Sequence, residues 1–191
     1  MVDNAHTATP NGWNQLIGGS NRVKAAVAIV LVISAIWFSA TCMRSQGALS
    51  HQVPALPTVK IRLDHSVFTL WVAATEAQKE KGLMNVTSLA ANRGMIFLFQ
   101  PPQTARFWMK NTLIPLDILF ILKSGKITNC LTMPVDNGKK IYISRGPISF
   151  AIELKVGTIR RCGLRVGQFV KLPIQRLKQI SSTANQEVSH P

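Results

Sequence analysis

Between Thr58 and Leu172 the sequence is divided into short apolar runs that are separated by glycine, proline and small polar residues. In the first run Val59, Ile61 and Leu63 alternate with polar residues, and this period of two is typical of a half-buried strand. The expected strands are 58–64, 67–73, 95–99, 105–109, 117–123, 126–133, 141–144, 148–154 and 168–172. The pattern therefore predicts a mainly β domain, an antiparallel β sandwich or barrel-like fold, rather than a doubly wound α/β fold.

One or two short helices are expected within this domain. Thr75 is followed three residues later by Gln78, which matches the capping box that opens a helix, and Gly82 is a stop signal. Residues 157–163 allow one helical turn with Thr158 as its cap.

Apolar patterning also predicts where two of the strands lie in the sheet. Residues 117–122 are apolar on both faces after Asp117, so this strand is expected in the middle of the sheet system. The alternating strand 58–64 is expected nearer an edge. After the last expected strand, residues 173–191 are predicted to be a polar C-terminal tail.

The N-terminal part of the chain contains one long apolar segment. No charged residue occurs between Lys24 and Arg44, and this run approaches the roughly 20 apolar residues that span a bilayer. Basic residues before the segment favour a single-pass protein of the cell membrane with its domain outside the cytoplasm, or a secreted domain if the segment is cleaved. The expected order is a polar cytoplasmic tail at 1–21, a transmembrane anchor or signal segment at 22–43, and a linker at 44–57.

The chain is strongly basic. Its formal net charge is +14, and 19 Lys and Arg residues stand against six Asp and Glu residues between positions 58 and 180. This balance favours acidic partners, such as anionic lipid or an anionic polymer of the cell envelope. The basic residues are spread singly, with 139–140 and 160–161 as the only adjacent pairs in that range, and no nucleic-acid-binding motif accompanies them. The pattern argues against nucleic acid as the partner.

Cysteine and histidine are too sparse for a metal or haem site. The chain has three Cys, no Cys-x-x-Cys pair and four scattered His residues, so no metal and no cofactor are predicted. Cys130 and Cys162 are expected either to form a disulfide outside the cytoplasm or to remain two buried thiols. The methionines could form a soft Cu(I) site, but core packing explains them better because no His or Cys accompanies them; they are Met84, Met95, Met109 and Met133.

The stretch Arg106–Leu122 has the densest apolar and aromatic content of the domain. Four polar residues interrupt it, and buried polar groups need partners because an unpaired buried charge is strongly unfavourable. The stretch therefore indicates either a structural polar network or a ligand site. Together with two residues from later strands, the candidate ligand-binding residues are Trp108, Lys110, Asn111, Thr112, Asp117, Tyr142 and Glu153.

Asp117 and Glu153 are the two carboxylates inside apolar strands, and they permit more than one interpretation. A pair of carboxylates across a cleft could hydrolyse a glycosidic bond. Trp108 and Tyr142 could instead bind the apolar face of a sugar ring, with its hydroxyls on Asn111 and Asp117. The structural alternative is that Lys110, Asn111 and Asp117 hydrogen-bond loop backbone and one another, while Glu153 neutralises an Arg or Lys. No catalytic residue is assigned, since His65 is the only His of the domain and lies in a predicted turn.

Six motifs follow one another in the domain: Gly82-Leu83-Met84, Gly94-Met95-Ile96-Phe97, Phe107-Trp108-Met109-Lys110-Asn111-Thr112, Ile114-Pro115-Leu116-Asp117, Tyr142-Ile143-Ser144, and Glu153-Leu154 followed by Gly157. In this order they resemble the domain-of-unknown-function family 192 (DUF192), over about residues 58–172. The resemblance implies a small, mainly β domain of the sandwich type, often behind a signal peptide or membrane anchor, and it implies no function. The chain departs from the family pattern at Gln168, where members usually have an acidic residue, and at 134–140, which lacks the Cys pair of some members.

Three functions from different classes remain open. The favoured one is a non-enzymatic domain of the cell envelope that binds a ligand or partner, such as a glycan or a protein, around Trp108 to Asp117. The second is a glycan hydrolase that uses Asp117 and Glu153. The third is a basic accessory protein that is held on anionic lipid or polymer.

Overall fold

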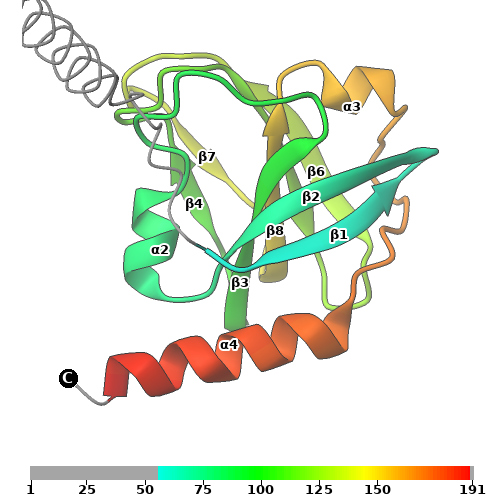
Figure 1. Cartoon of the computed structure of the whole chain (residues 1–191). Helices are drawn as coiled ribbons and strands as arrows, with labels where there is room; N and C mark the ends of the chain where they lie inside the picture. Colours follow the sequence, from blue (N-terminus) through cyan, green and yellow to red (C-terminus); the bar gives the residue numbers. More distant parts are fainter. Residues whose placement is uncertain (1–55, 190–191) are drawn as a thin grey trace, which may run out of the picture. The chain divides into compact units, whose positions relative to one another are not determined.

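Alternating apolar residues produce eight β-strands within residues 56–189, the part of the chain that the computed structural model describes (Figure 1). The strands are β1 (Thr58–Leu63), β2 (Ser66–Ala73), β3 (Arg93–Gln103), β4 (Arg106–Trp108), β5 (Leu116–Ile121), β6 (Ile127–Met133), β7 (Ile141–Ile143) and β8 (Ile148–Lys155). The helices of the same part are α2 (Glu76–Lys81), α3 (Thr158–Arg161) and α4 (Ile174–Ser189). The mainly β prediction is confirmed.

The predicted membrane segment belongs to the N-terminal part of the chain. The segment predicted to cross the membrane, 22–43, lies outside the described residues. Within residues 56–189, no helix combines the length and apolar character that a membrane span requires.

Six of the strands form one sheet, and the other two form a separate ribbon. The order in the large sheet is β1-β2-β3-β8-β5-β6, and β4 pairs with β7. Strand β5 lies between two neighbours and all six of its residues are buried, which is the internal position that its apolar pattern predicts. Strand β1 is at an edge, also as predicted.

The prediction of an antiparallel sheet is wrong at one pair, because β2 and β3 run parallel. A parallel pair needs a crossover connection, and residues 74–92, which include α2, provide it. The sheet is therefore mixed. Its described strand order ends at β1 and β6 without joining them, so the barrel does not close.

Each face of the large sheet is covered by its own hydrophobic core. On one face, side chains such as Leu70 and Ile152 pack with Leu177 of α4. On the opposite face, which we call the site face, Met95 and Phe97 pack with residues of β4, β7 and the segment after α2. Because side chains alternate along a strand, consecutive residues of β8 reach different cores.

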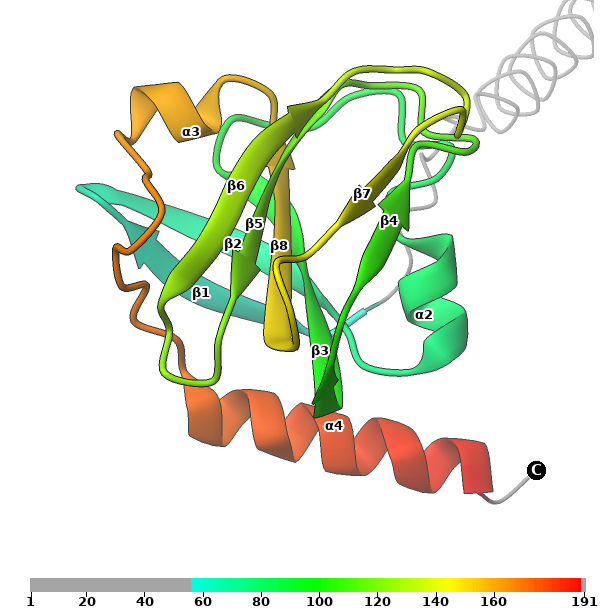
Figure 2. The same cartoon turned by 180° about the vertical axis from the view of Figure 1, so that it is seen from behind.

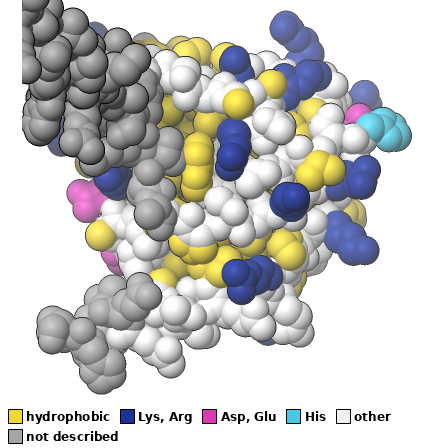
Figure 3. All heavy atoms as spheres, in the orientation of Figure 1, with side chains coloured by type: hydrophobic (Ala, Val, Ile, Leu, Met, Phe, Trp, Pro, Cys, Tyr) yellow, Lys and Arg dark blue, Asp and Glu magenta, His cyan; other side chains and the backbone are white. Residues whose placement is uncertain are grey.

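The arrangement of the helices is visible from both sides of the domain. Helix α2 lies beside β4, and α4 crosses one end of the sheet next to β3 (Figures 1 and 2). On the surface seen in Figure 3, Lys and Arg side chains are spread out with hydrophobic patches between them. This distribution matches the single spacing of basic residues along the sequence.

Three local features differ from the sequence prediction. The N-cap of α3 is Gly157, with φ of 86°, and Thr158 is instead the first residue of the helix, buried, with its Oγ1 donating a hydrogen bond to the carbonyl of Lys155. The expected strand 168–172 is reduced to one bridge between Phe169 and Lys126. The segment predicted as a polar tail forms helix α4, because an apolar stripe of few residues buries it against the sheet.

The two cysteines of the domain are free thiols, so the disulfide alternative is wrong. Cys162 belongs to the core that contains Leu70, and Cys130 packs against the same core with its Sγ 4.0 Å from the carbonyl oxygen of Leu164. Burial, and secondarily the charge of Asp117, raises the pKa of the Cys130 thiol.

Candidate functional site

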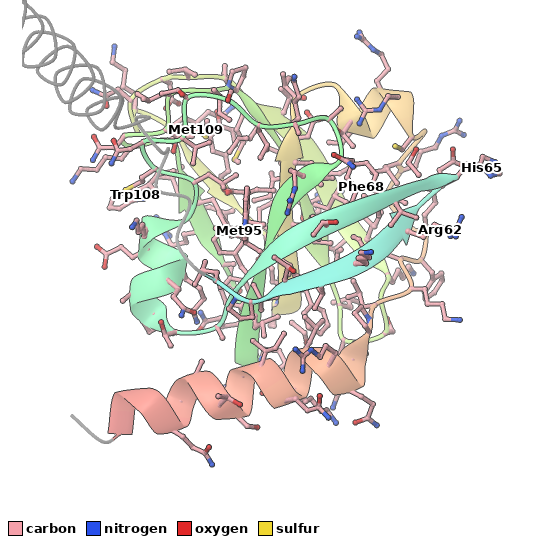
Figure 4. All side chains as sticks on the ribbon, in the orientation of Figure 1. Arg62, His65, Phe68, Met95, Trp108 and Met109 are labelled. Atoms are coloured by element: carbon pink, nitrogen blue, oxygen red, sulfur yellow. The ribbon has the colours of Figure 1, made fainter. Side chains whose placement is uncertain are left out.

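A cavity of about 440 Å³ lies between α2 and β4 on the site face. This volume is within the range of about 300–1,000 Å³ that is typical of small-molecule sites. Figure 4 shows Trp108 of β4 beside α2, at this cavity. The aromatic residues that line it are Phe97, Phe99, Phe107 and Trp108.

The aromatic residues form a connected cluster. The ring centroid of Phe107 lies 5.0 Å from that of Phe97 and 6.4 Å from that of Phe99, both in edge-to-face geometry. This is a favoured arrangement for aromatic pairs, so the cavity wall is well packed on its inner side. Trp108 remains 44% exposed and forms part of the cavity opening.

Local sequence signals position the α2 side of the cavity. The predicted capping box is present: Thr75 Oγ1 accepts a hydrogen bond from the backbone N–H of Gln78, and Gln78 Oε1 accepts one from that of Thr75. Gly82 then ends the helix with φ of +46° and lies against the ring of Phe97. This turn brings Leu83 and Met84 to the cavity.

Glu153 of β8 is the buried ionisable residue of the cavity. Its strand neighbours on the same face are Met95 and Ile118, and its side chain is 5% exposed. Its carboxyl has neither a hydrogen bond nor an ion pair with any residue between 56 and 189. Burial raises the pKa of Glu153 from its ordinary value of 4.5 to about 8, because the charged form loses its hydration.

Charged residues surround the cavity opening. Helix α2 contributes four of them, Glu76, Lys79, Glu80 and Lys81, and β4 contributes Arg106. The ammonium of Lys79 lies 2.6 Å from a carboxylate oxygen of Glu76. The opening therefore presents both signs of charge around an apolar interior.

Two other predicted site residues lie at this cavity. Trp108 lines it, and the ammonium of Lys110 lies 5.4 Å from the centre of the Trp108 ring. Thr112 is buried and also lines the cavity, although its Oγ1 donates a long hydrogen bond, 3.4 Å, to the carbonyl of Lys110.

The corner formed by Lys110 and Asn111 has a structural role. Asn111 has φ of +55°, and its carbonyl accepts a hydrogen bond of 2.8 Å from the backbone N–H of Asn85. Gly138 approaches Lys110 so closely that a Cβ there would be 3.0 Å from the Cβ of Lys110. The corner thus holds two other loops, and the exposed side chains of Lys110 and Asn111 do not line the cavity.

Asp117 is also structural, and it lies on the other face of the sheet. Its Oδ1 accepts a hydrogen bond from Thr132 Oγ1 at 2.7 Å, and its Oδ2 accepts one from the backbone N–H of Ile159 at 2.8 Å. Asp117 therefore stabilises the start of α3. In the pairing of β5 with β8, Asp117 is opposite Leu154, whereas Glu153 is opposite Ile118. The two carboxylates point to opposite faces and cannot act on one glycosidic bond.

Tyr142 belongs to the core of the site face rather than to the cavity. It pairs with Phe107 across the ribbon, and its hydroxyl is buried with no hydrogen-bond partner among the described residues. Burial, and secondarily the charge of Asp136, raises the pKa of Tyr142. The expected combination of Tyr142 with Trp108 and Asp117 in one site is not formed.

The structure thus brings Trp108, Thr112 and Glu153 together and separates the other four candidates. Sequence reasoning missed Phe97, Phe99 and the charged residues of α2. The capping box predicts that α2 exists, but no sequence signal indicates which face of the sheet it covers. Among the described residues no group of three or more His, Cys, Asp or Glu could hold a metal ion. His65 lies at the tip of the β1–β2 hairpin, apart from Trp108 (Figure 4).

Comparisons with known proteins give a family but no activity. The DUF192 family profile, described as "Uncharacterized ACR, COG1430", matches residues 58–172. The chain is similar to the solved structure of a proposed transcription regulator from Sinorhizobium meliloti 1021, at 32% identity and a TM-score of 0.59, over 62% of this chain and 95% of that one. It is also similar to a protein of unknown function from Novosphingobium aromaticivorans DSM 12444, at 33% identity and a TM-score of 0.59, over 64% and 90%. No curated protein matches the chain.

Proposed function

The chain belongs to the DUF192 family, and we propose that its domain is a non-enzymatic binding module that takes a small ligand into the cavity between α2 and β4. The observation that carries this proposal is Glu153. Its carboxyl is largely buried, lines the cavity and has no protein partner among the described residues, whereas an apolar side chain there would avoid the cost of removing a polar group from water. A ligand that hydrogen-bonds to Glu153 would give the carboxyl its missing partner.

The composition of the cavity supports binding rather than catalysis. The residues that line it include no Ser, Cys or His, so the usual pairs of nucleophile and base are absent from this wall. Asp117, the predicted second carboxylate of a hydrolase pair, faces the other core and cannot act together with Glu153. The aromatic wall would bind the apolar part of a ligand, and Glu153 would orient its polar end.

The location that we propose follows from the N-terminal segment. An anchor at 22–43 would hold the domain outside the cytoplasm, where glycans and proteins of the envelope are available as ligands. Added protease should then digest the domain on intact cells that carry the chain, and digestion that requires prior permeabilisation would contradict this orientation. DNA as a ligand has no support from the scattered basic surface.

Ligand binding can be tested on the full chain with ¹³C-labelled methionine methyl groups. Met84 lines the cavity, whereas Met133 is buried in the site-face core and does not line it, so a ligand should shift the Met84 signal more than that of Met133. Glu153→Gln and Trp108→Ala should each weaken that response. Asp64→Asn, at the distant hairpin tip, is the matched control. A survey of sugars, amines and carboxylic acids that never moves Met84 would overturn the proposal.

A further inference from the structure

We infer that the ligand of this cavity is a small organic ammonium ion, whose charged group meets the carboxylate of Glu153 while its carbon body lies against Phe107 and Trp108. The inference rests on the proposed function, because it names the chemical class of ligand for the same cavity. It is carried by three observations: the distribution of acidic residues, the ammonium groups already present on the aromatic wall, and the unpartnered carboxyl.

Acidic residues are concentrated at this cavity although the chain is basic. The whole chain has eight Asp and Glu, and three of them, Glu76, Glu80 and Glu153, line this one cavity. Of the 22 Lys and Arg residues, only three line it. An anionic ligand would find more basic surroundings over much of the remaining surface. At this cavity the acidic and basic residues are equal in number, three of each, in contrast to the basic excess of the chain as a whole, which makes it more favourable to a cation than the average surface.

The aromatic wall already accepts ammonium groups from the chain itself. The Nζ of Lys79 lies 5.1 Å from the centre of the Phe99 ring, and the Nζ of Lys110 lies 5.4 Å from that of Trp108. Such contacts within about 6 Å are favourable cation–π geometries. Lys79 is also paired with Glu76 at 2.6 Å, so its ammonium contacts both a carboxylate and an aromatic ring. Glu153 lines the same cavity as these rings but has no ammonium partner among the described residues.

If an amine forms an ion pair with Glu153, its binding releases a proton, and the number of protons released distinguishes an amine from other ligands. Glu153 is mostly protonated at pH 7, since its pKa is about 8 in the empty cavity. An ammonium ion favours the carboxylate, so binding should release close to one proton per ligand near pH 7. The titratable groups that line the same cavity are Glu76, Lys79, Glu80 and Lys81 from the α2 side and Arg106 from β4. The strand neighbours of Glu153 are Met95 and Ile118, which do not titrate.

The test compares three probes with the same ring: benzylamine, benzyl alcohol and benzoate. They are titrated into the full chain in nanodiscs of zwitterionic lipid, with empty nanodiscs as the blank and the Met84 methyl signal as the reporter. Benzylamine should bind at least about tenfold tighter than either analogue, the ratio expected for a charge-assisted bond of about 1.4 kcal/mol. Calorimetry in two buffers of different ionisation enthalpy should show proton release with the amine alone. Comparing glucosamine with glucose repeats the test for an ammonium group that is carried by a sugar.

Glu153→Gln separates the ion pair from cavity shape. This variant should lose the amine preference by about tenfold, so that benzylamine and benzyl alcohol bind with similar affinity, and it should release no proton. Asp64→Asn removes one charge at the hairpin tip and should change neither. If the alcohol binds as tightly as the amine, the ammonium inference is overturned while the proposed function stands. If no probe moves Met84, both are overturned.

Discussion

At the scale of single residues, Glu153 and Asp117 show how two similar side chains acquire different roles. Both are buried carboxylates on adjacent strands of one sheet. Asp117 has a hydroxyl and a backbone N–H as partners, whereas Glu153 has no partner among residues 56–189. A buried acid with partners holds a fold together, and one without partners is available to a ligand.

The raised pKa of Glu153 predicts a specific pH dependence of stability. The folded chain keeps this proton up to about pH 8, whereas the unfolded chain loses it near its ordinary pKa of 4.5. Unfolding therefore releases a proton between these values, and the free energy of unfolding should fall as pH rises, by up to about 1.4 kcal/mol per pH unit. Above pH 8 this contribution should be constant.

Denaturant unfolding at several pH values measures that slope. Glu153→Gln has no proton to release, so its unfolding free energy should lack this decline and should exceed that of the wild type at pH 8. The exposed Asp64→Asn variant should keep the wild-type slope. Parallel pH profiles for wild type and Glu153→Gln would show that Glu153 is hydrated and ionises normally.

Asp117→Ala is predicted to destabilise the fold without altering the cavity directly. The change removes the acceptor for Thr132 and for the N–H of Ile159, and it should lower the free energy of unfolding by about 2–4 kcal/mol. Asp136→Ala is a useful control, because Asp136 also accepts two backbone hydrogen bonds but in a surface loop, so its loss should be smaller. Wild-type stability with loss of ligand response in Asp117→Ala would instead assign Asp117 to the site.

At the scale of elements, the close approach of β3 and β8 positions Glu153. Gly94 of β3 is opposite Leu154, and a Cβ at Gly94 would lie 2.2 Å from the carbonyl oxygen of Glu153 and 2.9 Å from Cδ2 of Leu154. The glycine is required here for space, because its φ is not in the left-handed region. The cavity floor therefore depends on a residue that does not line it.

Gly94→Ala should separate the two strands and lower the free energy of unfolding by about 3 kcal/mol or more, since rigid backbone cannot move away cheaply. Thermal unfolding of the full chain would measure the loss. Gly146→Ala is the matched control: Gly146 has φ of +81° but nothing within 4 Å of an added Cβ, so only local strain of about 1 kcal/mol is expected. Equal losses in both variants would show that space at Gly94 is unimportant.

At the scale of the whole domain, α4 closes the core on the face opposite the cavity. Leu177 and Ile180 of this helix are buried with Leu70 and Ile152 of the sheet. The helix crosses the end of the sheet next to β3 (Figure 2). The site face and the α4 face thus share the same strands. A substitution that destabilises one core should therefore also destabilise the strands that line the other.

Leu177→Ala tests the contribution of α4. The buried leucine is 1% exposed, and its truncation should lower the free energy of unfolding by about 2–4 kcal/mol through lost contacts and an empty space. Thr183→Ala, on the exposed side of the same helix, should change stability by less than about 0.5 kcal/mol. Denaturant unfolding compares the two, and equal values would mean that α4 does not stabilise the core.

Much of this fold is predictable because it is local. Alternation of apolar residues identifies β1 and β2, the capping box at Thr75 identifies α2, and the doubly apolar pattern of β5 indicates an internal strand. Helix α4 is not predicted from the sequence, because only a few apolar residues are buried among its Ser, Asn and Gln residues. The parallel pairing of β2 with β3 is not predicted either, because it depends on where the crossover residues 74–92 pack.

The candidate site, like the fold, was predictable from the sequence only in part. The sequence by itself identified Trp108 and Glu153 as candidates, the first as an aromatic residue beside the polar Lys-Asn-Thr corner and the second as a carboxylate inside an apolar strand. Only the tertiary structure decided that Glu153 joins Trp108 while Asp117 does not. Alternation along β5 and β8 fixes which core each side chain enters, but the helix or ribbon that covers each core is set by contacts between residues far apart in the chain.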